Sequence, residues 1–97
     1  MRTLLFSSLA KNDLAGIAAY IAKQNPATGR AFVRRLRVHC RQLKRSPWVG
    51  EVCPQFESGE YRLIHYGSYA IFYEVTDQSV LVSRVIHSAQ DWGRMIE

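Results

Sequence analysis

The sequence predicts a two-layer α+β fold in which an N-terminal helical hairpin packs on an antiparallel four-stranded sheet. Two observations carry this prediction. The first half of the chain repeats apolar residues at helical spacing, and the second half holds three short runs of β-forming residues separated by tight turns. The chain has 97 residues, 47% of them hydrophobic, so a single domain over residues 1–97 with one core is expected. The predicted element order is β-α-α-β-β-β.

Two helices follow a short β-prone run over residues 3–6. The first is predicted from about Leu9 to Lys23, with Ser8 as its N-cap. Its buried face has i, i+3, i+4 and i+7 spacing and consists of Leu14, Ile17, Ala18 and Ile21. Asn25 caps the second helix, which is expected over residues 26–45 because Pro26 suits the first helical position.

The second helix carries the excess positive charge of the chain. Seven basic and no acidic residues lie between positions 30 and 45, which leaves six basic against eight acidic residues elsewhere. The apolar side of this helix consists of Phe32, Leu36, His39, Cys40 and Leu43. The opposite side is a basic ridge of Arg30, Arg34, Arg37, Arg41, Lys44 and Arg45.

The basic ridge is either a solvated helix face or a surface for an acidic protein or a nucleic-acid backbone. Like charges at helical spacing cost about 0.2–0.5 kcal/mol per pair, and the ridge has no acidic residues to offset them. An external anion would relieve this repulsion, which favours the binding surface.

Three strands are predicted at Tyr61–His65, Tyr69–Val75 and Val80–His87, joined by short turns as an antiparallel meander. With the helical hairpin on one face, the other face of the sheet is expected to be uncovered. Strict alternation places Arg84 on the same face as Val80, Val82 and Ile86.

Arg62, Arg84 and His87 stand out from the apolar strands. The two arginines either face an anion or form structural salt bridges or solvated positions. His87, at a strand end, is either an acid–base group or a hydrogen-bonded structural residue.

Several classes of chemistry are absent from the sequence. We find no Ser/His/Asp order, paired-carboxylate spacing, phosphate loop or metal-ligand cluster, so neither a metal nor a cofactor is expected. Cys40 and Cys53 are expected to be reduced thiols. No run reaches the length of a signal peptide core or a membrane span, so a soluble, cytoplasmic protein without membrane contact is expected.

Over nearly its whole length the chain resembles the ParE/RelE toxin superfamily of type II toxin–antitoxin systems. The resemblance rests on the order and spacing of several short pieces: Asp13-Leu14 with Ile17 and Tyr20-Ile21, Asn25-Pro26, Leu43 with Ser46-Pro47 and Gly50, Gly59 with Arg62, Tyr69-Ala70-Ile71-Phe72-Tyr73, and Arg84-Val85-Ile86-His87 with Ala89 and Asp91. It implies a helical hairpin on a twisted sheet with the first strand beside the last.

The resemblance also implies a choice of function, because RelE-type members cleave mRNA on the ribosome and ParE-type members inhibit DNA gyrase. The chain has Trp92 where RelE-like proteins have a tail Tyr, and no Lys or Arg lies between Arg45 and Arg62. Its ending from His87 to Asp91 is similar to that of ParE-type toxins. The expected protein is therefore a ParE-like toxin that poisons gyrase by binding rather than by catalysis and contributes to plasmid or chromosome stability.

The implied target-binding residues are Arg62, Arg84, His87, Asp91 and Trp92. Two alternatives stay open: a RelE-like ribosome-dependent endoribonuclease that uses Arg62, Arg84 and His87, and a degenerate member that is not toxic. The implied partner is a small, acidic, partly disordered ParD-like antitoxin that binds Arg30, Arg34, Arg37 and Arg41, and contact with DNA is expected only through the antitoxin complex.

Overall fold

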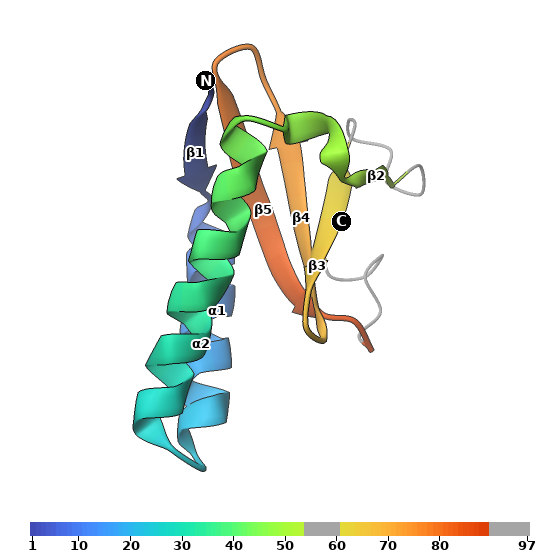
Figure 1. The fold of residues 1–97 in the computed structure, drawn as a ribbon. Helices are drawn as coiled ribbons and strands as arrows, with labels where there is room; N and C mark the ends of the chain where they lie inside the picture. Colours follow the sequence, from blue (N-terminus) through green and yellow to red (C-terminus); the bar gives the residue numbers. More distant parts are fainter. Residues whose placement is uncertain (54–60, 90–97) are drawn as a thin grey trace.

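The structure is a computed structural model that describes residues 1–53 and 61–89. It contains strand β1 (Thr3–Phe6), helices α1 (Ser8–Ala22) and α2 (Pro26–Cys40), two short 3-10 turns (Arg41–Lys44 and Pro47–Val49), and strands β2 (Glu51–Val52), β3 (Arg62–Tyr66), β4 (Tyr69–Val75) and β5 (Ser79–His87). The sheet order is β1-β5-β4-β3-β2, and the two helices run side by side as a hairpin (Figure 1).

The α+β class, the helical hairpin and the meander are as predicted, and the first strand does lie beside the last. The prediction of a four-stranded antiparallel sheet is wrong in two respects. The sheet has five strands, because Glu51–Val52 forms a short additional strand on β3. It is also mixed, because β1 pairs parallel to β5 from Thr3 opposite Ser79 to Phe6 opposite Val82.

Both helix starts are capped by a side chain. The first cap is Ser7 rather than Ser8, and its hydroxyl accepts a hydrogen bond from Ala10 N at 3.0 Å. Asn25 caps α2 as predicted. The α-helix ends at Cys40 rather than continuing to Arg45, because residues 41–44 tighten into a 3-10 turn that buries Leu43.

Glycine permits the close approach of the two helices. A Cβ at Gly29 would collide with the carbonyl oxygen of Ala18 on α1 and lie 3.2 Å from Ala22 Cβ. The hairpin packs on the sheet through one apolar cluster, which joins Leu14 and Leu36 to Tyr73, Val82 and other strand residues.

A bulge in β5 changes the face on which its residues lie. The pairing with β4 shifts between Phe72, opposite Arg84, and Tyr73, opposite Val82, so Ser83 is the extra residue. Val80, Val82 and Val85 therefore all join the cluster beneath the helices, while Ile86 joins a second cluster. The strict alternation predicted for this strand is wrong beyond Ser83.

The prediction that the second face of the sheet is uncovered is wrong, because the apolar side chains on this face are buried. Its apolar side chains form a smaller cluster with exposed fractions between 0% and 5%, made of Cys53, Leu63, Ala70, Phe72 and Ile86.

Both cysteines are free and buried, and burial raises the pKa of the Cys40 thiol to about 12. Among the described residues, no helix is long and apolar enough to cross a membrane.

Candidate functional site

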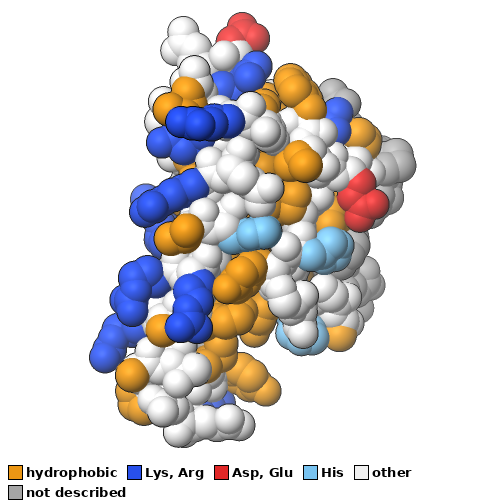
Figure 2. All heavy atoms as spheres, viewed as in Figure 1, with side chains coloured by type: hydrophobic (Ala, Val, Ile, Leu, Met, Phe, Trp, Pro, Cys, Tyr) orange, Lys and Arg blue, Asp and Glu red, His pale blue; other side chains and the backbone are white. Residues whose placement is uncertain are grey.

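The basic side chains of α2 line up along the outside of the helical hairpin (Figure 2). Arg30, Arg34 and Arg37 are exposed on the helix, and Arg41 continues the row at the start of the 3-10 turn. The structure therefore keeps the four residues that the sequence assigned to antitoxin binding on one continuous side of the molecule.

A groove of about 350 Å³ runs between α1 and α2 along this side. Its floor is apolar and consists of Leu14, Ala15, Ala18 and Val33. Its other lining residues are cations: Lys11, Arg30, Arg34 and Arg37. The guanidinium of Arg37 also lies 4.7 Å from the centre of the Phe6 ring, which holds this side chain at the groove.

The groove is suited to a segment that presents small apolar side chains to the floor and carboxylates to the cations. Sequence reasoning found the arginines of α2 but missed Lys11, which α1 contributes. The available signal was its position three residues before Leu14, one turn along the same helix.

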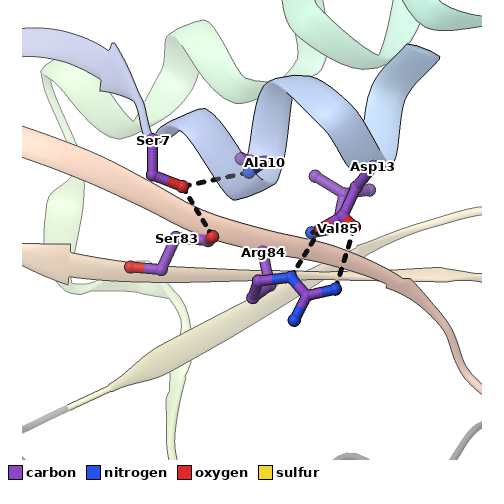
Figure 3. Close-up of polar contacts among 6 residues, drawn as sticks. All are labelled: Ser7, Ala10, Asp13, Ser83, Arg84 and Val85. Carbon is purple, nitrogen blue, oxygen red and sulfur yellow. Dashed lines mark hydrogen bonds and ion pairs between the residues drawn. The ribbon is translucent and has the colours of Figure 1, made fainter. Parts of the chain in front are cut away.

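Arg84 is engaged by Asp13 of α1 rather than directed at an open surface. Its Nε lies 2.7 Å from Asp13 Oδ2 and its Nη2 lies 2.9 Å from Asp13 Oδ1 (Figure 3). The side chains of Arg84 and Asp13 are only 13% and 15% exposed, and the hydrogen bonds that Arg84 donates to Asp13 raise the pKa of Arg84. Of the two interpretations of Arg84, the structure bears out the salt bridge.

The side chains of Asp13 and Ser7 form hydrogen bonds with the backbone of β5 beyond the last residue that pairs with β1. Asp13 Oδ2 accepts a hydrogen bond of 2.9 Å from Val85 N, and the Ser7 hydroxyl donates to Ser83 O at 2.7 Å (Figure 3). Helix α1 and its N-cap residue thus satisfy backbone groups of β5 that β1 is too short to reach.

Arg62 is also held by the protein. Its Nη1 donates to the carbonyl oxygens of Gly50 at 2.8 Å and Trp48 at 3.3 Å, and its guanidinium lies 5.1 Å from the centre of the Trp48 ring. The buried hydroxyl of Tyr73 joins the same turn, donating to Pro47 O at 2.7 Å and accepting from Gly50 N at 2.9 Å.

His87 lies at the exposed end of β5. Its ring packs edge-on against the Tyr69 ring, with 5.3 Å between the ring centres, and its Nδ1 accepts a hydrogen bond from Ala89 N at 3.1 Å. It lines a cleft of about 620 Å³ between α1 and the β3–β4 turn, together with Tyr20, Tyr69 and others. Asp13, the partner of Arg84, lines the same cleft as His87, whereas Arg62 contacts the separate turn at residues 47–50. Asp91 and Trp92 lie outside the described residues.

Metal coordination finds no support in the part of the chain that the structure describes. Within residues 1–53 and 61–89, no three or more His, Cys, Asp or Glu side chains gather as a metal ion would require.

A helical hairpin on a mixed sheet, with a basic groove between its helices, defines a small α+β protein with a surface suited to an acidic peptide segment. A family model described as the ParE toxin of type II toxin-antitoxin system, parDE, matches residues 4–92. The chain therefore belongs to the ParE toxin family of type II toxin–antitoxin systems.

The fold is also found in a solved structure described as the chromosomal ParDE TA system from P. aeruginosa. The two chains share 17% sequence identity and superpose with a TM-score of 0.77, over 90% of this chain and 96% of that one. At this identity the likeness shows the shared fold. Among curated proteins, no match is found.

Proposed function

We propose that this protein is a cytoplasmic toxin that arrests growth by binding DNA gyrase, and that a ParD-like antitoxin neutralises it. Membership of the ParE family supports the toxin class. The pairing of Arg84 with Asp13 is the observation that favours gyrase binding over RNA cleavage. A guanidinium whose charge is already matched by a carboxylate stabilises a developing phosphate charge less well than one held open for it.

The proposal is tested by adding purified toxin to gyrase and relaxed plasmid. We expect micromolar toxin to abolish supercoiling, and toxin preincubated with its antitoxin to leave supercoiling intact. Unaffected gyrase would exclude the proposed target. Toxin-dependent mRNA cleavage on translating ribosomes would instead support the endoribonuclease alternative, with Arg62, Arg84 and His87 at the substrate.

We propose that the antitoxin is a small, acidic, partly disordered protein that orders an amphipathic segment in the groove between α1 and α2. The apolar floor and the four surrounding cations support this assignment, and Arg41 extends the contact beyond the groove. Contact of the complex with DNA would then be made through the antitoxin.

Neutralising the cations of the groove should weaken antitoxin binding. We expect the triple variant Arg30→Gln, Arg34→Gln, Arg37→Gln to raise the Kd at least about tenfold and to flatten its dependence on salt, because interactions between exposed charges are screened by ions. Titration calorimetry at several ionic strengths measures both quantities.

A matched control removes the same amount of charge elsewhere. Lys23, Lys44 and Arg45 do not line the groove, so the triple variant Lys23→Gln, Lys44→Gln, Arg45→Gln should bind within about threefold of the wild type. Equal losses for the two variants would mean that the antitoxin responds only to overall charge.

A further inference from the structure

An exposed tryptophan lies on the turn that crosses the end of the sheet between α2 and β2, drawn in green in Figure 1. We call residues Pro47–Gly50 the Trp48 platform. Trp48 is 55% exposed and its neighbour Val49 is 58% exposed, although Pro47 and Gly50 on either side are buried. Two adjacent exposed apolar side chains form a patch, and an exposed apolar patch is a common mark of an interaction site.

The backbone of the platform is fixed from beneath. The Tyr73 hydroxyl bridges Pro47 O and Gly50 N, and Arg62 donates to the carbonyl oxygens of Trp48 and Gly50. Tyr73 is fully buried, so this support is part of the core. A side chain carried on a fixed backbone loses little conformational entropy when a partner covers it.

The surroundings of the indole define the chemistry of a partner. The guanidinium carbons of Arg2 and Arg62 lie 5.6 and 5.1 Å from the ring centre. Val52 on β2, 47% exposed, adds a further apolar side chain on the strand that follows the platform. The platform thus offers an apolar anchor flanked by two positive charges.

We infer that Trp48 is the anchor by which this toxin holds its target protein, inserting into an apolar pocket whose rim carries carboxylates. Trp and Arg dominate the binding energy of protein interfaces, most often at a packed centre surrounded by a polar rim. The identity of the target as gyrase rests on the proposed function, whereas the role of Trp48 in target binding does not.

The same surroundings disfavour two other occupants. Single-stranded nucleic acids bind to rows of aromatic side chains on which successive bases stack, but the exposed side chains that follow Trp48 in the chain, Val49 and Val52, are aliphatic. In a symmetric dimer of this chain, the platforms would bring Arg2 and Arg62 of both copies together, and like charges at an interface are unfavourable.

The test compares Trp48→Ala with Leu9→Ala, a matched loss of an exposed large apolar side chain, 58% exposed, from α1. Each variant is expressed in the host to measure growth arrest, assayed for inhibition of gyrase supercoiling, and titrated with the antitoxin. For Trp48→Ala we expect loss of growth arrest, an at least tenfold higher concentration for half-inhibition, and antitoxin affinity within threefold of the wild type. Trp48→Phe should restore part of the activity, and thermal unfolding should match the wild type.

The outcomes separate this inference from the proposed function. If Trp48→Ala relieves growth arrest while wild-type toxin leaves gyrase unaffected, the inference holds and gyrase is not the target. The inference is overturned if Trp48→Ala arrests growth like the wild type, if Leu9→Ala relieves growth arrest as strongly as Trp48→Ala, or if Trp48→Ala loses antitoxin binding. A wild-type toxin that does not arrest growth also overturns it.

Discussion

Replacing Asp13 with alanine should lower the free energy of unfolding by about 3–5 kcal/mol, the usual cost of breaking a buried ion pair by removing one partner. The carboxylate accepts three hydrogen bonds, from Arg84 Nε, Arg84 Nη2 and Val85 N. Its loss removes the two hydrogen bonds between Asp13 and a guanidinium that is only 13% exposed, and it leaves the Val85 N–H without its acceptor. For a protein of this size we expect Tm to fall by at least about 12 °C, measured by calorimetry.

Two further experiments make this expectation specific. Asp77→Ala likewise removes one negative charge, but from an exposed side chain on the β4–β5 turn, and should change stability by less than about 0.5 kcal/mol. In a double-mutant cycle, Asp13→Ala with Arg84→Ala should cost less than the sum of the single changes by about 1–3 kcal/mol. Additive costs would mean that the two side chains do not depend on one another.

Replacing Gly50 with alanine should destabilise the protein by about 3 kcal/mol, through overpacking and the loss of a buried hydrogen bond. The new Cβ would collide with the Tyr73 hydroxyl and lie 2.7 Å from Leu63 O and 2.9 Å from Tyr73 Cε1. Tyr73 is fully buried and cannot move aside, and Leu63 O belongs to the backbone of β3. Chemical denaturation measures the loss.

The chain contains a natural control for this change. A Cβ at Gly16, inside α1, would meet nothing within 4 Å. Gly16→Ala should therefore stabilise the protein by about 0.5–1 kcal/mol, because alanine is the better helix former. A Gly50→Ala protein as stable as the wild type would show that the Trp48 platform can shift without cost.

The helices were predictable because their stabilising contacts are local and periodic. The spacing of Leu14, Ile17 and Leu36 identifies the buried faces, and Asn25-Pro26 identifies the boundary between the helices. The cationic side of α2 follows from the same periodicity, so the arginines of the groove could be found without the structure.

The details of the sheet were not predictable, because they depend on residues far apart in the chain. Nothing near Thr3 specifies that its partner is Ser79 or that the pair is parallel. The single bulge at Ser83 reverses the inward-facing positions after it, so alternation misplaces Val85.

In the candidate site, too, some residues could be predicted from the sequence and their contacts could not. Arg62 and Arg84 could be recognised as unusual for core strands, but their partners could not. Asp13 is 71 residues from Arg84, and the carbonyls that hold Arg62 lie on a turn without regular pattern. Trp48 was missed because exposure of one aromatic side chain leaves no trace in the sequence.

The shortness of β1 has a consequence for the behaviour of the free toxin. Strand β5 continues for five residues past the last residue paired with β1, and an unprotected strand edge invites pairing with another chain. On that edge, Ser83 O and Val85 N are hydrogen-bonded to the side chains of Ser7 and Asp13. These two backbone groups are therefore not open to pairing with an incoming strand. We therefore expect helix α1 and its N-cap to disfavour self-association of the free protein through this edge, a property separate from both stability and target binding.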